Sequence, residues 1–148
     1  MGTSQKSRRT PLQTTDWPIA QLPGLSHQNE SLLQECGIAT TGQLLKKATT
    51  SDRRLALANQ LQIHVQHLNK WVALADLARI PSVGCQYCGL LLHAGVASAK
   101  QLAEIPIHRL HQQILRFYVA TMQRRDLCPS VEQAQEWIQQ AKMLCTIC

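Results

Sequence analysis

Aromatic side chains are scarce in this sequence, where they make up 4% of 148 residues and include a single phenylalanine. β-Sheets draw on aromatic and β-branched residues, so this scarcity argues against a sheet protein. It also argues against base stacking as a way to bind single-stranded nucleic acid. Hydrophobic residues still make up 45% of the chain. Because Leu, Ala and Gln abound, the composition predicts an all-α globular domain with a real core.

Long apolar runs are missing too, since none reaches the roughly 18 residues that a membrane-spanning helix needs. Arg8-Arg9 has no apolar stretch behind it, so no secretory signal is expected. We therefore expect a cytoplasmic protein with no membrane partner. Cysteines stay reduced in that compartment, so the six cysteines are expected to be thiols or metal ligands and not disulfides.

Motifs of the common enzyme classes are also lacking. The sequence contains no nucleophile elbow, no Walker loop and no dinucleotide-binding glycine fingerprint. Its nine acidic residues are scattered without an evident catalytic pair. We expect a protein without catalytic activity and without a cofactor.

The acidic residues are outnumbered by 15 Lys and Arg, which gives a formal net charge of +6. Such an excess suits an acidic partner, either nucleic acid or an acidic protein surface. The basic residues occur in small groups, and the alternative for each group is a solvated helix face. The arginines expected to attract a phosphate backbone are Arg53, Arg54, Arg109, Arg116, Arg124 and Arg125.

A helical unit occurs twice in the chain, displaced by 58 residues. Each copy opens with a turn, continues as an apolar helix and reaches a glycine that suits a helix end. The identities fall at turns and apolar positions, where a fold requires them, so a duplicated hairpin is predicted. Matching pairs are Pro23 and Pro81, Gln28 and Gln86, Leu33 and Leu91, Gly37 and Gly95, and Leu44 and Leu102.

The opening turn of each copy is a candidate phosphate site. In a helix-hairpin-helix motif two glycines let backbone amides approach a phosphate at a helix N-terminus. The first turn has Gly24 but Ser26 at the second glycine, and the second turn has Gly84 but Ser82 at the first. The alternative is that each hairpin builds the domain or docks a protein. The predicted backbone contacts are Gly24, Leu25, Ser26, Val83, Gly84 and Cys85.

Two C-x-x-C pairs, Cys85 with Cys88 and Cys145 with Cys148, are candidates for chemistry. Four thiolates at this spacing can hold zinc. A helix N-terminus can also lower the pKa of a thiol and make it redox-active. Cys88 has a plain alternative as the small core residue of its hairpin. We expect no metal, and keep these four cysteines as the candidate ligands.

Several uncommon residues recur in a recognisable order. Trp71-Val72-x-Leu74-Ala75-Asp76-Leu77 leads into Val83-Gly84-x-x-Tyr87, and Pro129-Ser130-Val131 precedes Trp137-Ile138. Through this order of residues the chain resembles the uncharacterised family called domain of unknown function 4332. The resemblance extends from about Leu22 to Lys142. The resemblance implies a tandem helix-hairpin-helix fold, related to modules that grip nucleic-acid backbones, and no established activity.

These observations define the expected organisation and function. Residues 1–16 are expected to form a disordered basic tail, and residues 143–148 a cysteine-containing C-terminal tail. Residues 17–142 are expected to form one compact domain of two tandem helix-hairpin-helix units, a connecting helical pair and a C-terminal helix. The first hypothesis is a non-enzymatic module that contacts the DNA or RNA backbone with little sequence specificity. The alternatives are a protein-interaction or assembly adaptor and, third, a zinc- or thiol-linked regulator.

Overall fold

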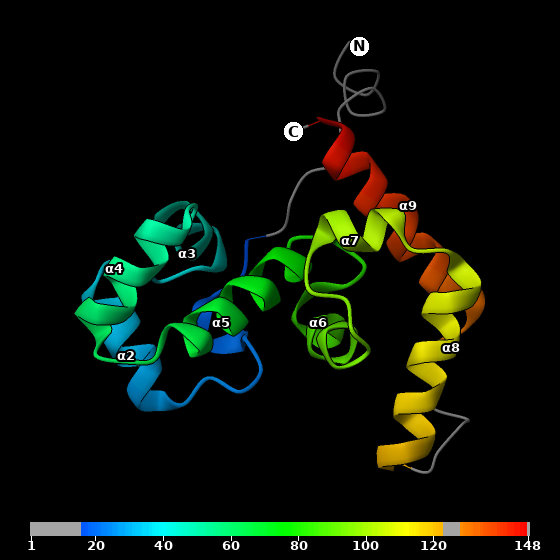
Figure 1. The fold of residues 1–148 in the computed structure, drawn as a ribbon, viewed down its shortest axis with the longest axis horizontal. Helices are drawn as coiled ribbons and strands as arrows, with labels where there is room; N and C mark the ends of the chain where they lie inside the picture. Colours follow the sequence, from blue (N-terminus) through cyan, green and yellow to red (C-terminus); the bar gives the residue numbers. More distant parts are fainter. Residues whose placement is uncertain (1–15, 123–127, 148) are drawn as a thin grey trace, which may run out of the picture.

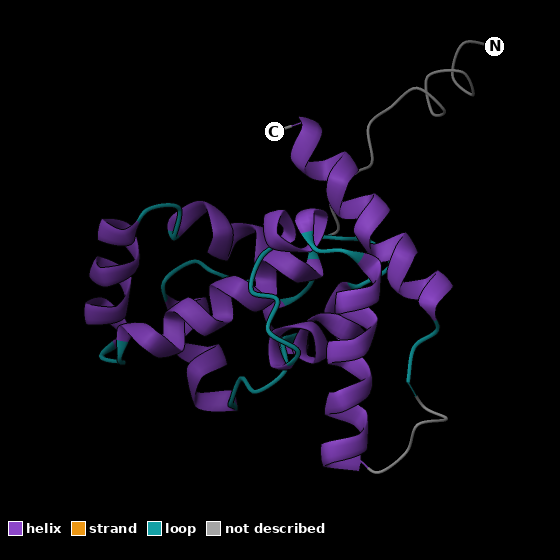
Figure 2. Ribbon diagram, turned by 45° about the vertical axis from the view of Figure 1, so that its right-hand side comes forward, coloured by secondary structure: helices purple, strands orange, loops and turns teal. Residues whose placement is uncertain are grey.

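The computed structural model describes residues 16–122 and 128–147 (Figure 1). These residues form eight α-helices and two short helical turns and no strand (Figure 2), which confirms the all-α prediction. Within the described ranges no helix has both the length and the apolar character to cross a membrane. The elements are η1 (Ile19–Gln21), α2 (His27–Glu35), α3 (Thr41–Lys47), α4 (Ser51–Leu61), α5 (Val65–Ala78), α6 (Gly84–His93), α7 (Ala99–Glu104), α8 (Ile107–Phe117), η2 (Tyr118–Met122) and α9 (Val131–Ile147).

Polar side chains begin most of these helices. The hydroxyls of Ser26, Thr40 and Ser98 each accept a hydrogen bond from the backbone N–H three residues later, as N-caps do. The imidazole Nδ1 of His64 accepts from the amide of Gln66 at 3.1 Å, so α5 begins at Val65. These caps define where the helices begin.

The two predicted hairpins have matching connections. The amide of Ile38 donates to the carbonyl of Leu33 after α2, and the amide of Val96 donates to that of Leu91 after α6, each at 2.9 Å. These residues occupy equivalent places in the two copies. The duplication read from the sequence therefore has a counterpart in the backbone hydrogen bonds.

The duplication extends beyond the hairpins to four helices on each side. Helix α3 packs on α5 as α7 packs on α9, and α4 packs on α5 as α8 packs on α9. Trp71 of α5 corresponds to Trp137 of α9, and Ala75 to Ala141, and all four are buried. The displacement has grown from 58 to 66 residues by this point. We call α2–α5 the first half and α6–α9 the second half.

A short segment before η1 bridges the two halves. The Trp17 carbonyl accepts from the amide of Thr41 in α3 at 2.8 Å, and its indole Nε1 donates to the carbonyl of Ala78 in α5 at 2.8 Å. The Trp17 ring also lies against Gly84, at the start of α6. Asp16 accepts from the amide of Gly42 at 2.8 Å, so it belongs to the folded part and not to the predicted tail.

The C-terminal boundary also differs from the prediction. Helix α9 continues past residue 142 as far as Ile147. Leu144 is buried in the core with 3% exposure, in register with the buried face of α9. Most of the segment expected to form a tail therefore extends the last helix, because its apolar residues continue the helical period.

Candidate binding site

The turn before α6, the second predicted phosphate contact, is covered by the chain itself. The amides of Val83 and Gly84 donate to the carbonyl of Ile80 at 3.0 and 2.9 Å. A Cβ atom added to Gly84 would lie 2.9 Å from atom Cζ2 of the Trp17 ring. Two of the three predicted amides are thus bonded within the turn, and an aromatic ring closes one side of it.

Side chains of α9 cover another side of this turn. The Ser82 hydroxyl donates to Glu136 Oε1 at 2.7 Å, and the Ser82 amide donates to Gln140 Oε1 at 2.9 Å. Gln140 Nε2 donates back to the Ser82 hydroxyl at 2.7 Å. A carboxylate therefore already lies at the second turn, where its negative charge opposes the approach of a phosphate.

The first turn is more accessible. Gly24 has a φ of +80°, and no atom lies within 4 Å of the position its Cβ would take. Ser26 is exposed and caps α2, whereas Leu25 is half-buried against the core. Glu30 stands in the first turn of α2, so a carboxylate occupies the end of the helix that favours anions.

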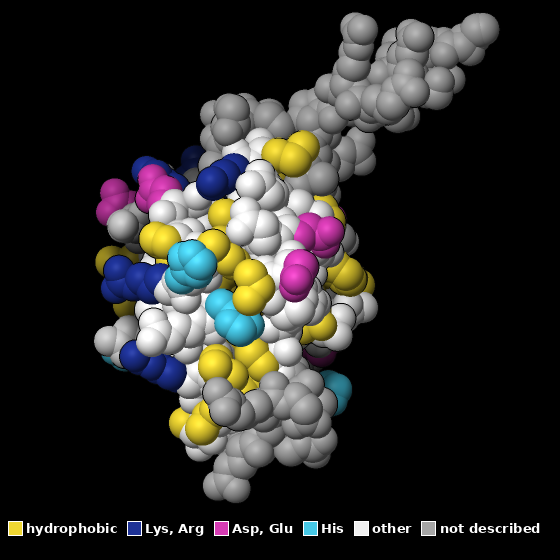
Figure 3. Space-filling view, turned by 90° about the vertical axis from the view of Figure 1, so that its right-hand side faces the viewer, with side chains coloured by type: hydrophobic (Ala, Val, Ile, Leu, Met, Phe, Trp, Pro, Cys, Tyr) yellow, Lys and Arg dark blue, Asp and Glu magenta, His cyan; other side chains and the backbone are white. Residues whose placement is uncertain are grey.

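Four of the arginines predicted to attract a phosphate backbone are described, and they do not gather beside the two turns. Arg79, which directly precedes the second turn, forms an ion pair with Asp76 at 2.8 Å. Arg53 and Arg54 lie on α4, and Arg109 and Arg116 lie on α8. Figure 1 places α4 and α8 at opposite ends of the molecule. Seen from the α8 side, basic, acidic, histidine and hydrophobic side chains are interspersed (Figure 3). Arg124 and Arg125 fall outside the described residues.

The positive charge of the chain falls mainly outside the part that the structure describes. The described residues include ten Lys and Arg and eight Asp and Glu, a net charge of +2. The remaining five Lys and Arg and one acidic residue lie in residues 1–15 and 123–127. The described residues therefore account for +2 of the net charge of +6.

The cysteines at the start of α6 have the properties of core thiols. Cys88 is fully buried, and burial, with a smaller contribution from Cys85, raises the pKa of its thiol to about 12. Burial also raises the pKa of Cys85. The alternative in which the helix N-terminus lowers a thiol pKa therefore receives no support, because desolvation raises the pKa of both thiols. Both thiols are protonated at neutral pH.

The zinc hypothesis receives no support from the described residues. No group of three His, Cys, Asp or Glu side chains in residues 16–122 and 128–144 is placed to hold a metal ion. The side chain of Cys145 and all of Cys148 lie outside this description. A site that uses the second C-x-x-C pair therefore stays an untested alternative.

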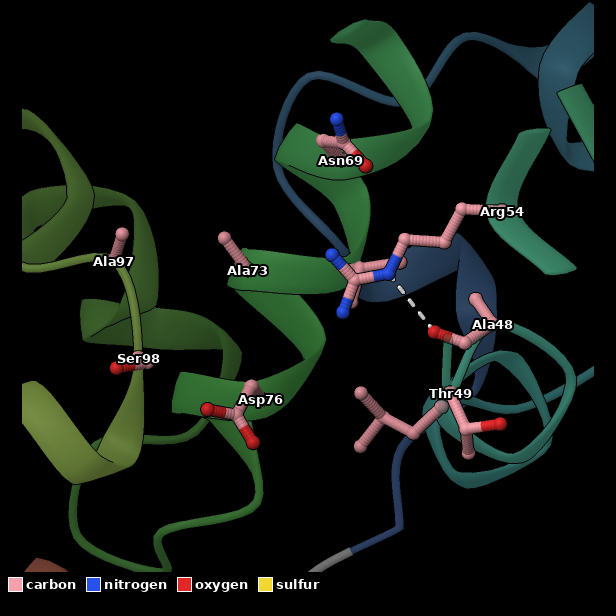
Figure 4. Close-up of a pocket in the computed structure, with 10 residues that line it drawn as sticks. Ala48, Thr49, Arg54, Asn69, Ala73, Asp76, Ala97 and Ser98 are labelled. Atoms are coloured by element: carbon pink, nitrogen blue, oxygen red, sulfur yellow. Dashed lines mark hydrogen bonds between the residues drawn. The ribbon is translucent and has the colours of Figure 1, made fainter. Parts of the chain in front are cut away.

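A cleft of about 550 Å³ lies at the junction of the two halves (Figure 4). We call it the junction cleft. Its walls come from α3 and α4, from α5, and from the connection between α6 and α7. Figure 4 shows the Arg54 side chain extending across it, between Ala73 of α5 and Ala48 at the end of α3. The sequence had singled out Arg54 only as a source of long-range attraction.

Charged groups in the junction cleft are held in fixed positions. Arg54 Nε donates to the carbonyl of Ala48 at 2.9 Å. Asp76 accepts from Arg79 Nε through Oδ1 and from the amide of Ala99 through Oδ2, both at 2.8 Å. No described carboxylate oxygen lies within 4 Å of the Arg54 guanidinium. Arg54 therefore enters the cleft as a positioned cation without an ion-pair partner in the described chain.

The described residues form a small all-α domain with a cleft between two similar halves. The chain belongs to the family described as a domain of unknown function (DUF4332), whose sequence model matches residues 23–144. This match confirms the family predicted from the sequence. No curated protein matches the chain, and no solved structure does.

Proposed function

We propose that this domain is a non-enzymatic adaptor that binds another protein. The observation that carries the proposal is the second turn, where Ser82 contacts Glu136 and Gln140 of α9. In this chain the turn binds a protein helix at the place where a phosphate contact was predicted. The proposal rests on the polar groups of this turn and not on the fold, because a fold alone does not define a function.

The charge distribution supports the same proposal. Nucleic-acid binding draws its affinity from many Lys and Arg that neutralise phosphates together. Here the described surface has a net charge of +2, and its arginines on α4 and α8 lie at opposite ends of the molecule. The described arginines on α4 and α8 therefore cannot neutralise neighbouring phosphates together, which favours a protein partner over nucleic acid.

Affinity capture with and without nuclease tests the adaptor proposal. The tagged full chain is incubated with a lysate of the source organism, and bound proteins are identified by mass spectrometry. We expect one defined protein to be recovered in equal amount after nuclease treatment, and the purified pair to bind each other. If no protein is recovered after nuclease treatment, the adaptor proposal is rejected and binding to nucleic acid is favoured.

Binding to the DNA or RNA backbone is the second candidate. The accessible first turn at Gly24 and the excess of basic residues outside the described ranges favour it. Fluorescence anisotropy with labelled duplex DNA, single-stranded DNA and RNA tests this candidate. If it holds, affinity falls steeply between about 50 and 200 mM salt, because counterions are released on binding. Absence of binding at low salt removes it.

A further inference from the structure

Arg54 has more hydrogen-bonding capacity than the chain uses. A guanidinium carries five N–H donors, and only Nε has an acceptor in the described structure, the carbonyl of Ala48 at 2.9 Å. The side chain is half-buried, and it has no described carboxylate within ion-pairing distance. Partial burial removes water from such a group, so an anion in the cleft would restore its missing partners.

The walls around Arg54 suit an anion attached to an aliphatic stem. Ala48, Ala73 and Ala97 line the cleft with methyl groups, so another chain can approach closely. Leu45 and Val72 add apolar surface beside them. Thr49, Asn69 and Ser98 also line the cleft, so its wall is part apolar and part polar. A carboxylate on methylene groups suits this mixture, because the stem can contact the apolar side chains while the guanidinium binds the carboxylate through two parallel hydrogen bonds.

The Asp76 carboxylate makes a single carboxylate a more suitable ligand for the cleft than a phosphate chain. Its carboxylate lines the same cleft and is held there by Arg79 and the amide of Ala99. The negative charge of Asp76 repels a polyanion more than a single carboxylate. We propose that the junction cleft binds an acidic side chain, Glu or Asp, of the partner protein through a bidentate pair with Arg54.

This proposal rests on the adaptor function and fails separately from it. If an Arg54→Gln chain captures the same partner with unchanged affinity, the adaptor proposal stands and the junction cleft is not its binding site. If no protein partner exists, capture fails for the wild-type chain as well. The test below therefore uses defined peptides and the complete chain.

Nuclear magnetic resonance of the full ¹⁵N-labelled chain provides a direct test, because the Nε–H of Arg54 reports on the guanidinium itself. The probes are acetyl-Ala-Glu-Ala-amide, the neutral acetyl-Ala-Gln-Ala-amide and inorganic phosphate. We expect the acidic peptide to shift the Arg54 Nε–H and the amides of Ala73 and Ala97 in a saturable way. The neutral peptide should leave them unchanged, and phosphate should bind more weakly.

Two substitutions on α4 separate this site from general charge attraction. Arg54→Gln should lower the affinity for the acidic peptide by at least about tenfold, because it removes a charge-assisted hydrogen-bonded pair. Arg53→Gln removes the same charge from the exposed neighbouring position and should leave the affinity within about twofold. Circular dichroism of both variants checks that they are folded. The chemical-shift changes of the wild-type chain test binding even if a variant does not fold.

Three results would overturn the proposal. The first is no saturable shift of the Arg54 Nε–H with the acidic peptide. The second is an equal loss of affinity in Arg53→Gln and Arg54→Gln, which would mean unspecific attraction. The third is tighter binding of phosphate than of the acidic peptide. That result would favour a nucleic-acid phosphate as the ligand of the junction cleft.

Discussion

Replacing Gly84 with alanine tests the contact that links the two halves. Gly84 has a φ of +53°, and the added Cβ would lie 2.9 Å from Cζ2 of Trp17. Carbon atoms do not approach so closely without repulsion, so the ring or the turn has to move. The indole is fixed by its hydrogen bond to the carbonyl of Ala78, which limits how far the ring can shift.

Two costs add up in this variant. The left-handed backbone costs an alanine about 1–2 kcal/mol relative to glycine. Overpacking against a ring that cannot move freely costs about 1–3 kcal/mol more. We expect Gly84→Ala to lower the free energy of unfolding by about 3 kcal/mol. Gly24→Ala is the matched control, because its φ is +80° and no atom lies within 4 Å of its added Cβ.

Urea denaturation followed by circular dichroism at 222 nm measures both variants. We expect Gly24→Ala to lose only the backbone contribution, about 1–2 kcal/mol. In a Trp17→Leu background the ring is absent, so Gly84→Ala should also lose only about 1–2 kcal/mol. The reasoning is refuted if the two glycine variants lose equal stability, or if Trp17→Leu leaves the cost of Gly84→Ala unchanged.

Three further predictions concern single side chains. Gln62 ends α4 with a left-handed φ of 59°, so Gln62→Gly should raise the free energy of unfolding by about 1 kcal/mol in urea denaturation, and a loss would contradict this account. Ser82→Ala should lower it by about 1 kcal/mol because Glu136 and Gln140 lose their partner; Ser31→Ala, at an exposed position of α2, should have little effect, and equal effects would count against the contact. The pKa of about 12 leaves about one Cys88 thiol in 10⁴ ionised at pH 8, so iodoacetamide should modify Cys88 only after unfolding in urea; peptide mass mapping checks this, and equal labelling in the folded chain would disprove it.

Local features of the fold were predictable because their causes lie within a few residues. The hydroxyls of Ser26 and Ser98 cap α2 and α7 by bonding to amides three residues later. The equivalent connections after α2 and α6 repeat because the same apolar and turn residues recur at a constant displacement. Such interactions depend on sequence neighbours, so a pattern of residue types is enough to predict them.

Contacts between distant segments were not predictable in the same way. The indole of Trp17 donates to the carbonyl of Ala78, which joins residues 61 positions apart. Gln140 meets the turn at Ser82 across 58 positions. Which surfaces meet depends on the packing of both halves together, and no local pattern of residue types encodes that.

The correspondence between α5 and α9 was hidden by a change of spacing. The connection between α8 and α9 is longer than its counterpart, so Trp71 and Trp137 are 66 and not 58 residues apart. The position of Arg54 in the junction cleft was not predicted for a related reason. Its neighbours in the junction cleft, Ala73 and Ala97, come from α5 and from the second half, and small apolar residues give no signal of a site on their own.

The position of Trp17 has a consequence for how the protein unfolds. Repeated helical units that touch only their neighbours can lose structure one after another, from an end. Trp17 bonds to α3 in the first half and packs against Gly84 in the second, while lying near one end of the described chain. Separation of the halves therefore requires Trp17 to lose its contacts with at least one of them. The bridge joins two units of common design into one cooperative unit, so the junction cleft exists only while both halves are folded.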